Sequence, residues 1–113
     1  MYQKILVPMA LDHDVSPHTL AIAAALKSDD GKIVALHVHE AVQDSVRSYL
    51  DEATLKSGFE QSRKVLEDKV KGFEGVATDA VTGHTARTII DYAAEHKIDC
   101  IVIGSHRPGL SDY

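Results

Sequence analysis

Apolar residues in this chain gather in four short runs, and amphipathic stretches lie between the runs. A short run of aliphatic and β-branched residues, bounded by glycine, proline or charge, is typical of a buried strand. Apolar positions that recur at a spacing of three or four residues are typical of a helix that covers a sheet. This pattern predicts strands and helices in strict alternation. We expect strands over 4–8, 32–40, 75–83 and 99–104, and helices from 17 to near 31, within 41–74 and over 85–97.

The first expected helix has a clear beginning. Ser16 offers a hydroxyl for the N-cap, and Pro17 suits the first helical position because its missing N–H is not needed there. Three small residues of this helix, Ala21, Ala24 and Ala25, form a flat face that we expect to lie close to the sheet.

The second helical stretch is strongly charged but carries one apolar stripe. Its large apolar residues recur at spacings of seven, four and three positions, which places them on one helix face. Gly58 lies near the beginning of the stripe, and we expect it to divide the stretch into a short part and a longer helix. The stripe consists of Phe59, Leu66, Val70 and Phe73.

Strands that alternate with helices predict a parallel sheet with right-handed crossovers, which is a doubly wound α/β fold. The length of 113 residues fits a single domain. In such folds, ligands bind beyond the carboxyl ends of the strands, where the strand order reverses. If the first strand is central and the fourth lies beside it, two loops line this crevice, residues 8–15 and residues 104–113.

Charge and composition give no indication of a nucleic-acid or membrane partner. The formal net charge is −5, and no cluster of Lys and Arg suggests a face for nucleic acid, so we expect none to bind. The apolar runs are too short to span a bilayer, so we expect no membrane insertion. The single cysteine, Cys100, cannot form an internal disulfide, which fits a reducing cytoplasm.

The loop after the fourth strand is the best candidate for binding chemistry. Neither GxGxxG nor GxxxxGK[ST] occurs, so the common Rossmann and P-loop fingerprints are absent. The sequence instead has GSHRPG at residues 104–109. Gly104 permits a sharp turn and a close approach of a ligand to the main chain. Backbone N–H groups of Ser105 to Arg107 could then face an anion, although a glycine after a strand is more often only a turn.

Three segments together resemble the universal stress protein family along nearly the whole chain. They are KILVP at residues 4–8, LHVHE at residues 36–40, and TGHTARTIIDYAAEHKIDCIVIGSHRPG at residues 82–109. The resemblance implies a Rossmann-like domain of the adenine-nucleotide alpha-hydrolase type. It also implies that residues 1–113 form a single universal stress protein domain that is C-terminally incomplete, with four of the usual five strands and without the fourth helix.

One branch of this family binds adenine nucleotide and is marked by G-x2-G-x9-G-[ST] after the fourth strand. Gly104 matches the first glycine of that motif, Arg107 stands at the second, and Gly109 follows two residues later. The final pair would fall beyond Tyr113. The resemblance therefore supports a nucleotide site with one glycine replaced.

The resemblance also implies which residues touch the nucleotide. Pro8 and Met9 would line the adenine end, and Val38 would pack on the base. Ile103 and Gly104 would form the floor of the site. The full set of implied site residues is Pro8, Met9, Ala10, Asp12, Val38, Ile103, Gly104, Ser105, His106, Arg107 and Gly109.

The ribose and phosphate end is less regular than the family pattern. His106 and Arg107 would lie near the ribose or the phosphates. The family commonly has an aspartate for the ribose hydroxyls, and Ala10 stands at that position. Either Asp12 reaches in from a longer loop, or the contact is lost.

The remaining residues give little support for metal binding or covalent catalysis. His37 and His39 project from one face of their strand and could begin a metal site, but two partly buried histidines with hydrogen-bond partners are the stronger expectation. Cys100 lies in an apolar strand and is expected to be inert. Ser105 and His106 lack the G-x-S-x-G elbow of a hydrolase. No catalytic residue and no metal ligand is predicted.

The sequence thus predicts a cytoplasmic universal stress protein that binds ATP, or AMP or ADP, with Mg²⁺ as a possible companion of the nucleotide. It would act as a regulatory stress-response module, and ATP hydrolysis would at most be slow and incidental. A homodimer or higher homo-oligomer is expected. The alternative is a nucleotide-free module of the same fold for dimerisation and protein interaction, which Arg107 and Ala10 favour.

Overall fold

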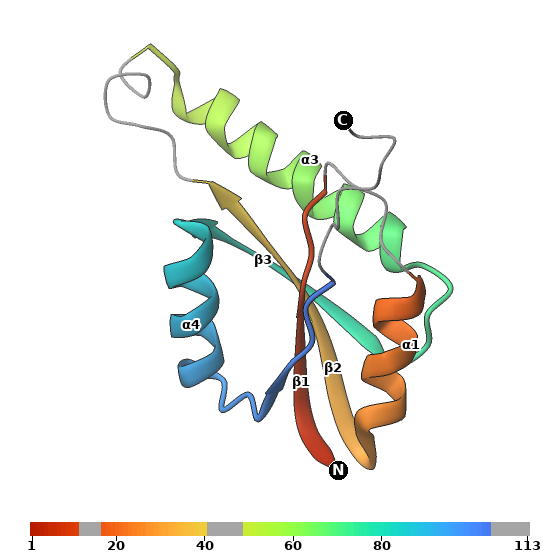
Figure 1. Cartoon of the computed structure of the whole chain (residues 1–113). Coiled ribbons are helices and arrows are strands. Elements are labelled where there is room, and N and C mark those ends of the chain that lie inside the picture. Colours follow the sequence, from red (N-terminus) through yellow and green to blue (C-terminus); the bar gives the residue numbers. More distant parts are fainter. Residues whose placement is uncertain (12–16, 41–48, 105–113) are drawn as a thin grey trace, which may run out of the picture.

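A parallel sheet forms the centre of the molecule (Figure 1). The structure is a computed structural model, and it describes residues 1–11, 17–40 and 49–104. Within these residues the strands are β1 (Tyr2–Pro8), β2 (Lys27–Glu40), β3 (Val76–Gly83) and β4 (Cys100–Ile101), and they lie in the order β3-β2-β1-β4. The helices are α1 (Pro17–Leu26), α3 (Glu52–Val70) and α4 (Thr85–Glu95). The predicted doubly wound α/β fold is confirmed.

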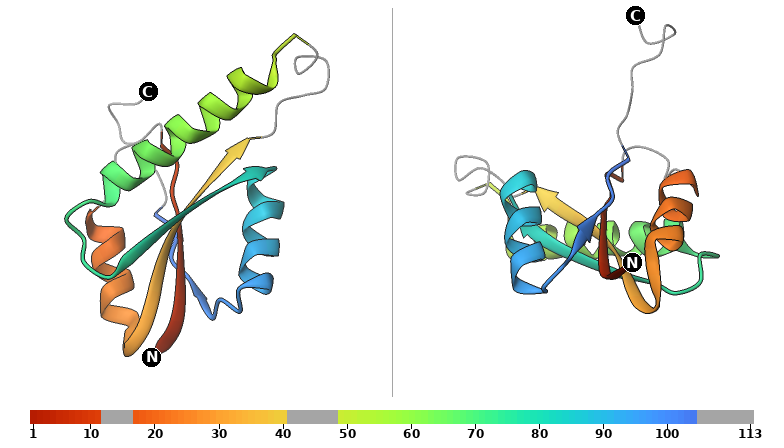
Figure 2. Two further views of the ribbon diagram at one scale, coloured as in Figure 1. Left: turned by 180° about the vertical axis from the view of Figure 1, so that it is seen from behind. Right: turned by 60° about the horizontal axis from the view of Figure 1, so that its bottom comes forward.

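The alternation of side chains along β1 and β2 divides the core between the two faces of the sheet. Ile5 and Val7 of β1 pack with Leu20 of α1, whereas Leu6 between them packs with Tyr92 of α4. Leu66 of α3 packs on the same face as α1, through β2. Helices α1 and α3 therefore cover one face and α4 covers the other, and Figures 1 and 2 show α1 and α4 on opposite sides of β1 and β2.

The connection from α1 to β2 differs from the prediction. The helix ends at Leu26, and residues 27–31 already run beside β1. Tyr2 pairs with Lys27 and Lys4 pairs with Lys32, so β2 has more residues than β1 between these two pairs. This part of β2 is therefore irregular. The physical reason is a contact with β1: the Ser28 hydroxyl donates to the carbonyl of Tyr2 at 3.2 Å, and Asp and Gly in this segment are poor helix formers that oppose this contact little.

The face of α1 that contacts the sheet also differs from the prediction. Leu20 and Ala23 are buried, with 2% and 0% of their surface exposed. The alanines expected there, Ala21, Ala24 and Ala25, are exposed. Large aliphatic side chains of the sheet fill the space more fully against Leu20 than against a flat alanine face.

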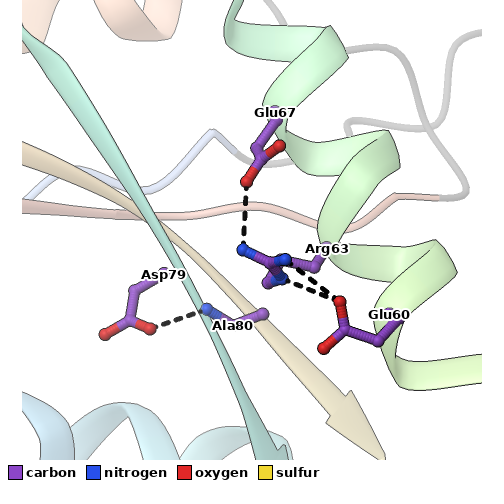
Figure 3. A network of polar contacts seen from close by, with 5 residues as sticks. All are labelled: Glu60, Arg63, Glu67, Asp79 and Ala80. Carbon is purple, nitrogen blue, oxygen red and sulfur yellow. Dashed lines mark hydrogen bonds and ion pairs between the residues drawn. The ribbon is translucent and has the colours of Figure 1, made fainter. Parts of the chain in front are cut away.

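Helix α3 confirms the apolar stripe as far as Val70 and corrects the expected break, whereas Phe73 lies beyond the helix and is partly buried against the core. Leu66 and Val70 are buried at 0% and 6% exposure, and the helix runs through Gly58 without interruption. Asp51 is its N-cap, with the carboxylate accepting from the N–H of Thr54 at 2.7 Å. On the outer surface, Figure 3 shows Arg63 between Glu60 and Glu67. These exposed ion pairs contribute little to stability.

Strand β4 is shorter and more exposed than predicted. Only Cys100 and Ile101 belong to the ladder with β1, although the N–H of Val102 still donates to the carbonyl of Leu6 at 2.9 Å. Ile101 and Ile103 are 40% and 69% exposed. The cause is that β4 lies at an edge of the sheet in the part of the chain that the structure describes, so one side of the strand has no neighbour there.

The beginning of β4 is fixed to the beginning of β1 by one carboxylate. Asp99 accepts hydrogen bonds from the N–H groups of Gln3 and Lys4, both at 2.9 Å, and these bonds hold the pKa of Asp99 below its usual value. Its own N–H donates to the carbonyl of Lys4 at 3.1 Å. The register of β4 against β1, which sets the position of the loop after β4, is therefore well determined.

Candidate functional site

The strand order reverses between β1 and β4, and this is where a doubly wound sheet binds its ligands. The chain leaves β1 toward α1 and β2 on one side, and it returns through β4 on the other side. Because β1 and β4 are parallel neighbours, their carboxyl ends lie at the same edge of the sheet. The assumption that β1 is central and that β4 lies beside it is confirmed. The described members of the predicted site on these two chain segments therefore lie at one edge of the sheet; they are Pro8, Met9, Ala10, Ile103 and Gly104.

Met9 is the best-anchored residue at this edge. Its N–H donates to the carbonyl of Leu36 at 2.8 Å, and its carbonyl lies 3.2 Å from Nδ1 of His37. The Met9 side chain is partly buried against the core beneath α1 and α3. Beside it, Pro8 pairs with Leu36 in the ladder and is half-buried. Both residues thus have fixed positions.

Ala10 follows Met9 and is exposed. Its methyl group offers no hydrogen bond, so it cannot bind a ribose hydroxyl in the way an aspartate does. At the end of β4, the Ile103 side chain is mostly exposed and presents an apolar surface next to Gly104. The described edge is therefore mainly apolar, which suits a planar base more than a charged group.

Gly104 lies against the first turn of α1. A Cβ atom added to Gly104 would be 2.6 Å from Oγ1 of Thr19, which is too close for any other residue without a local shift. A larger residue at this position would therefore require the Thr19 side chain or the end of β4 to shift. The contact also brings the amino-terminal turn of α1 beside the end of β4, and the amino-terminal end of a helix favours negative charge.

Val38 does not present a free side chain to this edge. It is 7% exposed and packs with Leu6, Leu36 and Tyr92 on the face covered by α4. Val38 pairs with Val81 of β3, one strand away from the reversal point. The contact of Val38 with a base stays a prediction from the resemblance.

The remaining members of the predicted set lie outside the described residues. For these positions the site stays a prediction from sequence. They are Asp12, Ser105, His106, Arg107 and Gly109.

The two histidines of β2 have the partners that a structural role requires. His37 contacts the Met9 carbonyl, and Nδ1 of His39 lies 3.3 Å from the hydroxyl of Ser62 in α3. The ring of His39 also packs edge-on against Phe59, with centroids 6.0 Å apart. Both rings are half-buried, as expected. Among the described residues, no three His, Cys, Asp or Glu side chains lie close enough to hold a metal ion.

Sequence reasoning missed two contacts that shape this edge. It did not connect His37 with Met9, which are far apart in sequence, nor Thr19 with Gly104. The alternation in LHVHE puts His37 on the same strand face as Ala35, and parallel pairing puts it beside the residue after β1. That register was the only signal in the sequence, and it requires knowing that β2 is the neighbour of β1.

A second polar contact lies at the carboxyl end of β2. The N–H of Thr85 donates to the Glu40 carboxylate at 3.2 Å, and the Thr85 hydroxyl donates to the same oxygen. These bonds lower the pKa of Glu40 from its usual value. His84, the N-cap residue of α4, makes no side-chain cap bond, so Glu40 supplies the cap from another strand.

Comparison with known proteins identifies the family. The sequence model of the universal stress protein family matches residues 1–113. The chain belongs to the universal stress protein family. A search of curated proteins finds no match.

Solved structures support the same fold for this universal stress protein. A structure reported for the structure-based assignment of the biochemical function of hypothetical protein MJ0577 is 26% identical, with a TM-score of 0.73 over 100% of this chain and 82% of that chain. A member of the universal stress protein family from Burkholderia pseudomallei is 26% identical, with a TM-score of 0.62 over 93% and 83%. UspA from Lactobacillus plantarum is 24% identical, with a TM-score of 0.58 over 96% and 83%.

None of the helices in the described residues combines the length and the apolar character that a bilayer crossing needs.

Proposed function

We propose that this universal stress protein binds an adenine nucleotide at the carboxyl ends of β1 and β4 and acts as a regulatory module. The observation that carries the proposal is the strand order β3-β2-β1-β4, because its reversal point brings Met9 and Gly104 to one edge. Apolar Ile103 beside them gives a base a surface on which to lie. The residues present fit an adenine ring better than they fit a metal ion.

The phosphate end of the proposed site rests on the neighbourhood of α1. The close packing of Thr19 on Gly104 brings the first turn of α1 to the edge where phosphates would lie. Free N–H groups of a helix beginning stabilise phosphate charge. His106 and Arg107, which follow Gly104 in the sequence, would add donors and positive charge. Mg²⁺ would enter with ATP, since phosphate oxygens commonly supply its ligands.

The direct test is to identify what the purified protein carries. Mass spectrometry of the small molecules released by denaturation should find ATP, ADP or AMP, and calorimetry should show binding of the same nucleotide to the stripped protein. A folded protein that carries none of the three and gives no heat with any of them would refute the proposal.

A glycine pair makes the test specific to the site. Gly104→Ala places a methyl group against Thr19, so it should weaken nucleotide binding by shifting the end of β4. Gly58→Ala in α3 is the matched control, because nothing lies within 4 Å of the added atom. The control should bind like the natural protein. Equal loss in both variants would show that the effect is not local to the proposed site.

The second candidate is a nucleotide-free module for dimerisation and protein interaction. The edge position of β4 favours it, because Ile101 and Ile103 are exposed beside a strand edge that has no partner among the described residues. Unpaired strand edges promote pairing with another chain. Sedimentation should then show a dimer, and Ile101→Lys should shift it toward monomer. A protein that is monomeric at all concentrations would refute this candidate.

A further inference from the structure

We propose that His37 is a positioning residue for the nucleotide site, because its imidazole fixes the carbonyl of Met9. This inference rests on the proposed function. His37 is not part of the family motif after β4. It lies on β2, whereas the strand order reverses between β1 and β4.

The geometry at Met9 shows why one side chain matters there. The Met9 N–H is held by the ladder partner Leu36 at 2.8 Å, as in any strand continuation. The Met9 carbonyl is held instead by His37, whose Nδ1 is 3.2 Å away. A carbonyl can only accept, so Nδ1 of His37 must carry the proton in this contact. Both polar groups of the Met9 backbone are thus bound to β2, one by main chain and one by side chain.

The position of Met9 makes this contact relevant to a ligand. Met9 is the last residue that β2 holds before the exposed Ala10, so the direction in which the chain leaves β1 is set at Met9. Without the imidazole, the N–H bond remains and the peptide after Met9 can rotate. The end of β1 would then sample orientations that the ligand must restrict on binding, which lowers affinity.

His39 provides an internal control on the same strand face. It is half-buried like His37, and the two rings pack edge to face with centroids 6.4 Å apart. However, the hydrogen bond of His39 goes to Ser62 of α3 at 3.3 Å, away from the end of β1. Replacing His39 removes a half-buried imidazole from the same strand face without removing a hydrogen bond to Met9.

The experiment uses the purified full chain and three variants, His37→Leu, His37→Asn and His39→Leu. Calorimetry measures the Kd of ATP and of adenosine, and thermal unfolding measures stability. His37→Leu should weaken both ligands by a similar factor, about 3- to 10-fold, the worth of one neutral hydrogen bond. His37→Asn should restore binding to within about 2-fold, because an amide N–H can stand near the position of Nδ1. His39→Leu should lose stability while its nucleotide affinity stays within about 2-fold.

Two results would overturn the proposal. One is a His37→Leu variant that binds adenosine as tightly as the natural protein. The other is a loss of affinity in His39→Leu that equals the loss in His37→Leu, which would show a merely structural effect.

A ligand-free measurement separates this inference from the proposed function. Long-range ¹⁵N–¹H spectra of the imidazoles should show His37 protonated on Nδ1, and His37→Leu should shift the amide signals of Ala10 and Leu11 more than His39→Leu does. If the natural protein binds no nucleotide, the proposed function fails, while these shifts still support positioning of the β1 end. If the tautomer is Nε2–H, the positioning inference fails even when ATP binds.

Discussion

The hydroxyl of Tyr92 offers a sharp test of how α4 is attached to the sheet. Tyr92 is 8% exposed, and its hydroxyl donates to the Asp79 carboxylate of β3 at 2.7 Å. The other carboxylate oxygen of Asp79 accepts from the N–H of Ala80 at 2.9 Å, as Figure 3 shows. The Tyr92 ring also stacks on His96 with centroids 3.9 Å apart. One side chain therefore joins the apolar core to a polar contact.

Tyr92→Phe isolates the polar part of this attachment, because the ring, its burial and its stacking are retained. A hydrogen bond to a charged group contributes about 1.5 to 3 kcal/mol, and the half-buried Asp79 carboxylate would lose its tyrosine donor. With a urea m-value of about 2 kcal/mol/M, the unfolding midpoint should fall by about 1 M. Urea unfolding followed by circular dichroism at neutral pH measures this change.

The pH dependence of the stability gives a second test of the contact between Tyr92 and Asp79. Burial, followed by the hydrogen bond to Asp79 and the charge of its carboxylate, raises the pKa of Tyr92 well above its usual value. A phenol whose pKa is raised on folding contributes stability below its unfolded pKa of about 10, and that contribution is lost as the pH rises further. The natural protein should therefore lose stability above about pH 10 more steeply than Tyr92→Phe does.

The control is a double-mutant cycle with Asp79→Asn. If the hydroxyl acts through Asp79, the combined variant should be less destabilised than the sum of the two single variants. A Tyr92→Phe midpoint within about 0.2 M of the natural value, or strictly additive effects, would refute the reasoning.

Three further predictions concern other parts of the fold. Leu66→Ala should lower the free energy of unfolding, measured in urea, by about 2 to 5 kcal/mol because Leu66 is fully buried. The control Ile90→Ala, at a side chain 63% exposed, should lower it by less than about 1 kcal/mol. Similar losses in the two variants would contradict the assigned core. Gly58→Ala should stabilise the protein by about 0.5 to 1 kcal/mol, since Gly58 lies inside a helix with free space around it, and a destabilised variant would contradict an unbroken α3. Glu40→Ala should lower the melting temperature at neutral pH, because the Thr85 donors stabilise the ionised carboxylate of Glu40. The difference between the variant and the natural protein should vanish as the pH falls through the lowered pKa of Glu40. A difference that persists in acid would contradict this cap.

Much of the fold could be predicted because the signals are local. The β-branched run before Pro8 and the apolar stripe that begins at Phe59 each identify their element by spacing alone, although the stripe extends past the end of α3 to Phe73. Failures occurred where tertiary contacts overrule local preference. The residues after Leu26 joined β2 because Tyr2 pairs with Lys27, and no helix signal reports such a pairing. Gly58 remained helical because the packing of α3 on the sheet outweighs the small cost of one glycine.

Only those parts of the site that follow directly after a strand could be predicted from the sequence. Sequence placed Met9 and Gly104 at one edge, and the strand order confirmed that placement. The resemblance also implied that Val38 packs on the base, which stays a prediction; in the structure this side chain packs beneath α4. The contacts of Thr19 and His37 depend on which elements are neighbours in space. Such information is distributed over the whole chain and is absent from any single motif.

The central claim is that adenine nucleotide binds where β1 and β4 end. The most direct test is an ATP titration followed by amide ¹H–¹⁵N spectra of the whole chain. The largest shifts should fall on Met9, Ala10, Ile103 and Gly104, while Val76 at the opposite end of the sheet should stay unchanged. Shifts centred on another edge, or spectra that ATP leaves unchanged, would contradict the account.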